Sequence, residues 1–146
     1  MTIGVLHGPN LNLLGRRQPE LYGTRTLAGI DEALRALAGE LGVDLEILQS
    51  NHEGALVDAV QDMAARVGGF VVNAAGYTHT SVALLDALLA VDLPYVEVHL
   101  TNIQGRERFR RRSLLSADAL GTVSGFGATS YELGLRALVS HLRRGG

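Results

Sequence analysis

The chain has 146 residues with 15 acidic and 13 basic side chains, and its formal net charge is -2 at pH 7. Its content of 47% apolar and 19% charged residues excludes a disordered chain. Its pI of 6.2 gives no electrostatic reason to bind nucleic acid or an anionic membrane. We therefore expect neither nucleic acid nor a membrane as a partner. The length predicts one domain spanning residues 1–146.

Two missing residue types exclude several kinds of chemistry. The sequence has no cysteine, which excludes disulfides, thiolate nucleophiles and cysteine metal sites. All 13 basic residues are arginines, so no lysine can form a Schiff base or complete a P-loop. The N-terminus lacks the basic flank of a signal peptide, and no apolar run approaches the ~18 residues of a membrane span. We expect a cytoplasmic protein that uses no cofactor.

Short apolar runs alternate with helical patterns along the chain. Residues 3–7 form an apolar run, and residues 26–41 show apolar side chains at helical spacing between a capping threonine and a closing glycine. The pattern predicts further strands at 43–48, 70–73, 95–100 and 121–126, and further helices at 53–67, 81–91 and 130–143. Five strands separated by helices predict an α/β protein, a flavodoxin-like doubly wound three-layer sandwich with a parallel sheet.

Polar side chains gather where the predicted strands end. They are Asn10, Asn12, Asn73, Thr78, His79, Thr80, Ser81, His99, Thr101 and Asn102. Because ligands of open α/β sheets bind beyond the carboxyl ends of the strands, these residues predict a binding site at one edge of the sheet. The alternative is ordinary turn and cap chemistry, for which asparagine, serine and threonine are also preferred.

The histidines differ in what their surroundings indicate. Glu97 and His99 are two residues apart on one strand, so they face the same side, and a carboxylate can fix the tautomer of an imidazole and stabilise its charged form. The alternative is a structural ion pair. His79 precedes a predicted helix, as a cap or a surface residue, while His7 and His52 are interpreted as structural. No pair of histidines has the spacing of a helical zinc motif, so we expect no metal site.

Two segments carry arginine. The irregular segment 15–23 places Arg17 near Tyr22, a phenol that needs nearby cations to act as a base at neutral pH. Arg106 and Arg110 are four residues apart, which predicts one helical face suited to a substrate carboxylate. A solvated face or a weak nucleic-acid patch is the alternative. The available groups fit proton abstraction beside a carbonyl, followed by loss of a hydroxyl.

Several blocks of the sequence resemble the type II 3-dehydroquinate dehydratases. The opening block is residues 8–17, with Pro19 and Tyr22-Gly23 following. The later blocks are residues 49–54, 73–81 and 97–102, with Arg106 and the run 109–111. The blocks follow one another in order and at compatible spacing over essentially the whole chain, which makes the resemblance specific.

The resemblance implies an enzyme that dehydrates 3-dehydroquinate to 3-dehydroshikimate in the shikimate and quinate pathways. The family uses neither a cofactor nor a Schiff base, in agreement with the missing lysine. By the resemblance, Tyr22 removes the proton at C2 and Arg17 lowers the pKa of Tyr22. Asn10 helps to hold the water that stabilises the enolate. His99, oriented by Glu97, is the general acid for departure of the C1 hydroxyl.

The resemblance also implies substrate-binding residues and an assembly. The substrate-binding positions are Asn73, His79, Thr101, Asn102, Arg106 and Arg110, with Asp86 supplied by a neighbouring subunit. The implied assembly is a homododecamer of four trimers. Independently, the predicted helix 81–91 is apolar over most of its circumference and Asp86 is its only charge, which favours a subunit contact. Departures from the family pattern are small: Thr101 replaces a common serine, and Leu114 a common aromatic residue.

Two other classes of function remain open. One is a flavodoxin-like binding or signalling module, although the chain lacks the lysine of a receiver domain and the G-x-G-x-x-G motif of a dinucleotide binder. The other is a non-catalytic assembly protein that keeps the scaffold, and the presence of Tyr22, Arg17, Asn10 and His99 argues against it. The biosynthetic or catabolic role of an enzyme also stays open.

Overall fold

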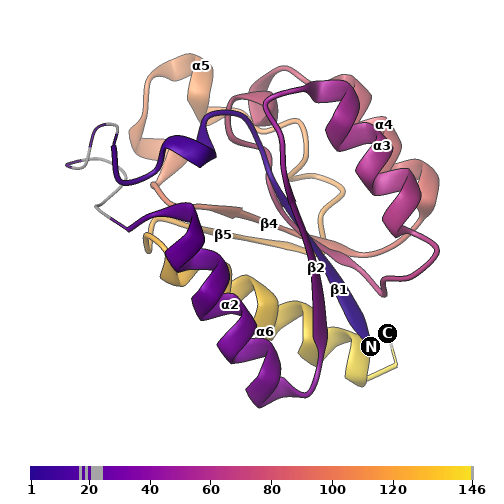
Figure 1. Ribbon diagram of the computed structural model, residues 1–146. Helices are drawn as coiled ribbons and strands as arrows, with labels where there is room; N and C mark the ends of the chain where they lie inside the picture. Colours follow the sequence, from indigo (N-terminus) through magenta and orange to yellow (C-terminus); the bar gives the residue numbers. More distant parts are fainter. Residues whose placement is uncertain (17, 19, 21–24, 146) are drawn as a thin grey trace.

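The computed structural model describes residues 1–16, 18, 20 and 25–145 and contains one five-stranded parallel sheet (Figure 1). The strands are β1 (Thr2–His7), β2 (Asp44–Gln49), β3 (Phe70–Asn73), β4 (Tyr95–His99) and β5 (Gly121–Ser124). Their spatial order is β2-β1-β3-β4-β5, and all four pairings are parallel. This is the flavodoxin-like doubly wound order, so the predicted fold class is confirmed.

Helices cover both faces of the sheet. α2 (Leu27–Leu41) and α6 (Thr129–Arg143) lie on one face, and α3 (Glu53–Met63) and α4 (Val82–Val91) lie on the other (Figure 1). The described residues also form four short elements, namely η1 (Leu11–Leu13), η2 (Ala75–His79), η3 (Ile103–Gly105) and α5 (Arg108–Arg111). Within the described residues, no helix is both long and apolar enough to cross a membrane.

Local sequence signals explain where the first long helix begins and ends. The hydroxyl of Thr26 accepts a hydrogen bond from the backbone N–H of Gly29 at 3.1 Å, which caps the amino end of α2. Gly42 ends the helix with a φ of 70°, in the left-handed region that glycine adopts without strain. Both ends agree with the prediction from sequence.

The core consists of two apolar layers, one on each face of the sheet. Val5, Val71 and Val96 pack with α2 and α6, whereas Leu6 and Val72 pack with α3 and α4. This alternation follows from the two-residue period of a strand. All four residues of β3 are buried, as expected for a central parallel strand covered on both faces.

Some predicted boundaries were wrong. The structure ends α3 at Met63 rather than at residue 67, because the chain turns after Ala64 and brings Val67 back into the core. The fifth strand ends at Ser124 rather than at residue 126, because Gly125 has a φ of 95° that breaks the extended backbone. The other boundaries agree with the prediction to within one residue.

Gly8, directly after β1, allows two loops at the carboxyl edge of the sheet to touch. A Cβ atom at this position would lie 2.3 Å from the carbonyl oxygen of Ala74 and 3.0 Å from its Cα. The backbone N–H of Gly8 also donates to the carbonyl of Asn73 at 2.7 Å. The loop that carries Asn10 therefore packs directly on the loop that follows β3.

Candidate active site

A cavity of about 140 Å³ lies at the carboxyl ends of β1, β3 and β4. Its walls include seven of the polar residues singled out from the sequence, Asn10, Asn73, His79, His99, Thr101, Arg106 and Arg110. Apolar and small residues complete the walls, namely Pro9, Leu11, Ala75, Gly76, Leu100 and Ile103. The expected gathering of polar side chains at this edge is therefore present.

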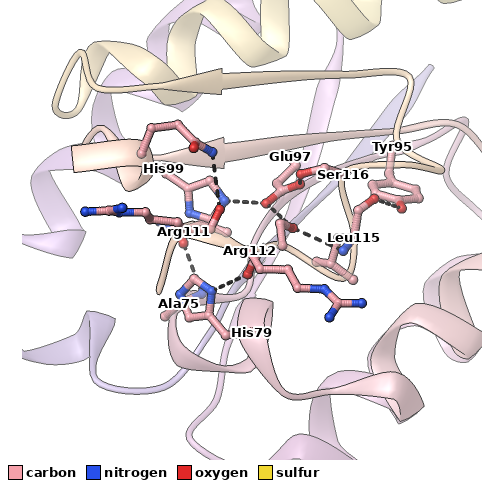
Figure 2. Close-up of polar contacts among 12 residues, drawn as sticks. Ala75, His79, Tyr95, Glu97, His99, Arg111, Arg112, Leu115 and Ser116 are labelled. Carbon is pink, nitrogen blue, oxygen red and sulfur yellow. Dashed lines mark hydrogen bonds and ion pairs between the residues drawn. The ribbon is translucent and has the colours of Figure 1, made fainter. Parts of the chain in front are cut away.

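His99 is held in this wall by the buried carboxylate of Glu97, and Glu97 itself is fully buried. Nε2 of His99 contacts Oε2 of Glu97 in a short hydrogen bond (Figure 2). The hydroxyl of Ser113 donates to Oε2 at 2.7 Å, and the hydroxyl of Ser116 donates to Oε1 at 2.7 Å. Because Nε2 is engaged by the carboxylate, Nδ1 of His99 is the nitrogen that can act on a bound molecule.

These contacts set the charge of Glu97. Burial alone raises the pKa of a carboxyl, but the hydrogen bond and charge of His99, together with hydrogen bonds from Ser116 and Ser113, outweigh burial and lower the pKa of Glu97. Glu97 is therefore ionised at neutral pH, and its carboxylate faces Nε2 of His99. Sequence reasoning missed both serines, because they lie 16 and 19 residues beyond Glu97 and no motif links them to it.

The depressed pKa makes a prediction about acid stability. Glu97 stabilises the fold above its ordinary pKa of ~4.3, and this contribution is lost as the pH falls through the lower pKa of the folded state. Replacing Ser116 by alanine removes one donor and raises the pKa of Glu97, at a cost of about 1–3 kcal/mol. We expect the Tm of this variant to fall less between pH 7 and pH 3 than the wild-type Tm, because a folded-state pKa closer to the ordinary value narrows the pH range over which the contribution of Glu97 is lost. Thermal unfolding from pH 7 to pH 3 measures both curves.

The exposed Ser140 provides the control for this comparison. Ser140→Ala removes a hydroxyl that does not touch Glu97, so its Tm should follow the wild-type curve at every pH. If Ser116→Ala ran parallel to the wild type through the acid range, Ser116 would not set the pKa of Glu97.

Three more side chains reach the cavity, one from the end of β3 and two from the segments that follow β1 and β3. His79, in η2, donates from Nδ1 to the backbone carbonyl of Arg112 at 2.7 Å (Figure 2), so Nε2 remains for a ligand. Asn73 is 4% exposed, and its Oδ1 accepts the N–H of Ala75 at 3.1 Å. Asn10 has a φ of 68°, and its N–H donates to Oδ1 of Asn51 at 2.9 Å. His79 is thus a residue of the cavity wall, and neither a helix cap nor only a surface residue.

The two arginines reach the cavity from separate elements, so the predicted common helical face was wrong. Arg106 follows η3 with extended backbone, and only Arg110 lies in the four-residue helix α5. Nη1 of Arg106 is 3.4 Å from Oγ1 of Thr101, and Nη1 of Arg110 is 2.6 Å from Oε2 of Glu107. Both guanidinium groups still line the cavity, where they favour an anionic ligand.

The remaining predicted residues lie elsewhere. Asn102 borders a second cavity of about 230 Å³, which also touches Glu97 and His99. Asp86 is exposed on α4 and does not line the cavity of its own chain. Tyr22 and Arg17 lie outside the described residues. In the part of the chain that the structure describes, no group of three or more histidine, aspartate or glutamate side chains could hold a metal ion.

Comparison with known proteins gives consistent matches over the length of the chain. The family described as dehydroquinase class II matches residues 1–139. A 3-dehydroquinate dehydratase from Prochlorococcus marinus (strain NATL1A) is 54% identical over 144 residues, which are 99% of each chain. A 3-dehydroquinate dehydratase from Bordetella avium (strain 197N) is 59% identical over 141 residues, which are 96% of this chain and 98% of that one.

Solved structures agree with these relatives. The type II dehydroquinase from Butyrivibrio crossotus superimposes with a TM-score of 0.92 at 35% identity, over 94% of this chain and 97% of that one. The type II dehydroquinase from Propionibacterium acnes gives a TM-score of 0.90 at 40% identity, over 95% of this chain and 96% of that one. Sequence and fold therefore agree, and the chain belongs to the class II dehydroquinase family.

Proposed function

We propose that this chain dehydrates 3-dehydroquinate to 3-dehydroshikimate in the shikimate pathway, in the cytoplasm and without a cofactor. The observation that carries the proposal is the His99–Glu97 pair in the wall of a cavity that two arginines also line. An imidazole paired with a carboxylate can supply a proton, and arginines can hold a carboxylate substrate. The relatives that bear the name 3-dehydroquinate dehydratase support the same reaction.

In the proposed mechanism, an anti elimination proceeds through an enolate. The phenolate of Tyr22 takes the proton from C2, and the electron pair of the broken C–H bond forms the enolate with the neighbouring carbonyl. Arg17 favours the phenolate by its charge. When the enolate collapses, the C1–O bond breaks and His99 donates a proton to the departing hydroxyl. The products are the conjugated enone and one water molecule.

The other residues of the site bind and orient the substrate in this proposal. Arg106 and Arg110 hold the carboxylate, and Asn10 helps to hold a water molecule at the enolate oxygen. Asn73, His79, Thr101 and Asn102 bind further oxygens of the substrate. Glu97 is a positioning residue, because its fixed carboxylate orients His99.

A direct assay tests the proposed function. The purified chain is mixed with 3-dehydroquinate, and formation of the conjugated enone is followed by its ultraviolet absorbance. We expect turnover without added metal or cofactor. Binding of 3-dehydroquinate by calorimetry without any product would contradict the proposal and favour a binding module.

The absence of lysine makes a prediction about trapping. Borohydride added with 3-dehydroquinate should not inactivate the enzyme, because no side-chain imine exists to be reduced. Intact-mass spectrometry should find the mass of the chain unchanged. A reduced adduct on the protein would contradict the proposed mechanism.

We also propose that the chain assembles as trimers, four of which form a dodecamer, and that Asp86 reaches the active site of a neighbouring subunit. Val82 is 58% exposed and Leu89 is 46% exposed, and both share one face of α4 with Asp86. An apolar helix face of this kind favours contact with another protein surface. The exposed face of α4 is thus the face that carries Asp86.

Replacing Asp86 by alanine tests this arrangement. We expect KM for 3-dehydroquinate to rise about tenfold, or ~1.4 kcal/mol, with little change in Tm, because an exposed side chain contributes little to the stability of its own chain. Steady-state kinetics and thermal unfolding measure the two quantities, and sedimentation measures the assembly. A fully active monomer at assay concentration would refute the proposed trimer.

A further inference from the structure

A buried network of hydrogen-bonded side chains lies next to the cavity, and the proposed mechanism does not use it. His7 at the end of β1 and Tyr131 on α6 are both fully buried, and Nδ1 of His7 is 2.8 Å from the Tyr131 hydroxyl. Nε2 of His7 is 2.7 Å from Oδ1 of Asp31 on α2, whose side chain is 27% exposed. The two rings meet edge to face with centroids 5.2 Å apart. Burying these groups is unfavourable unless their hydrogen bonds are satisfied.

This buried network extends to Asn73 in the cavity wall. His7 and Asn73 are paired across β1 and β3, and the backbones are joined by the 2.7 Å hydrogen bond from Gly8 to Asn73. The side chain of Asn73 also hydrogen-bonds the Tyr131 hydroxyl. Asn73 is therefore the residue through which the buried network reaches the cavity.

The donors and acceptors of these groups allow one consistent arrangement. A carboxylate oxygen of Asp31 accepts, so Nε2 of His7 donates to it and Nδ1 accepts the Tyr131 hydroxyl proton. The Tyr131 oxygen then accepts from the side-chain nitrogen of Asn73. Burial raises the pKa of Tyr131 far above its ordinary value, more than the Asn73 hydrogen bond lowers it, so the hydroxyl remains a donor.

The arrangement holds the Asn73 amide by both of its ends. Its oxygen accepts the N–H of Ala75, and its nitrogen faces Tyr131. Rotation of the amide by half a turn would place two donors against each other at Ala75 and leave Tyr131 facing an oxygen. We propose that Tyr131 and His7, anchored by Asp31, are positioning residues that fix the orientation in which the Asn73 amide meets the substrate. This inference rests on the proposed function, because it assigns Asn73 to substrate binding.

A double-mutant cycle tests the inference. Tyr131→Phe keeps the ring and removes the hydroxyl, and we expect KM for 3-dehydroquinate to rise about fivefold or more while kcat changes less. In an Asn73→Ala background the same replacement should leave KM unchanged, because no amide remains to be oriented. Val139→Ala, also buried on α6, is the control: it should lower Tm and leave KM unaltered. Independent, additive effects of Tyr131→Phe and Asn73→Ala on KM would overturn the inference.

Two replacements of His7 give a second test. In His7→Asn the side-chain oxygen can take the place of Nδ1 and accept from Tyr131, so KM should stay within about twofold of the wild type. In His7→Leu the acceptor is lost, and KM should rise as in Tyr131→Phe. If the wild-type chain is active and the two variants have equal KM values, the inference is overturned. Absence of turnover in the wild-type chain would instead contradict the proposed function, and this inference with it.

Discussion

Replacing Tyr22 by phenylalanine is expected to lower kcat by about a thousandfold, which corresponds to ~4 kcal/mol in the activation barrier. The variant lacks the phenol that we propose as the base at C2. No lysine or cysteine exists elsewhere in the chain to replace it. Steady-state kinetics with 3-dehydroquinate measures the loss, and thermal unfolding shows whether the fold is retained.

A matched control comes from Tyr77, whose hydroxyl donates to the backbone carbonyl of Asn51 at 2.7 Å and does not line the cavity. Tyr77→Phe also removes one phenol and should leave kcat close to the wild-type value. If purified Tyr22→Phe kept more than about a tenth of the wild-type kcat, a loss below ~1.4 kcal/mol, Tyr22 would not be the base.

Replacing His99 by alanine is expected to lower the rate of dehydration by about a hundredfold or more, the usual contribution of a general acid. Because Tyr22 acts in the earlier step, exchange of the C2 proton with solvent should fall much less. Deuterium incorporation into recovered 3-dehydroquinate measures exchange, and the ultraviolet assay measures dehydration.

His52 provides the matched control for this replacement, since it is exposed before α3 and lies outside the cavity. His52→Ala should leave both rates unchanged. If exchange and dehydration fell in parallel in His99→Ala, the separate roles of Tyr22 and His99 would be wrong.

The fold could be predicted well from the sequence because its main signals are local. The apolar run 70–73 and the capped helix 27–41 lie where the pattern places them. The pattern failed for Arg106 and Arg110, because a spacing of four residues indicates a common face only if the helix is continuous. An extended backbone at Arg106 and Glu107 breaks that continuity.

The site could be predicted in part because the carboxyl ends of parallel strands meet at one edge of the sheet. That rule brings Asn73 and His99 together although they are far apart in the chain. The rule gives no information about side chains that contact the site residues from outside the cavity. Ser116 reaches Glu97 from a loop, and Tyr131 reaches His7 across 124 residues, so only the packed structure reveals them.

The contact between Gly8 and Ala74 has a consequence for how this sequence can diverge. The neighbour of Gly8 is backbone, which cannot move aside as a flexible side chain can. A replacement of a cavity-wall side chain such as Thr101 changes that side chain and leaves the contact between the two loops in place. Any larger residue at position 8 would separate the loop that carries Asn10 from the loop that follows Asn73. Position 8 is therefore restricted to glycine unless both loops change together.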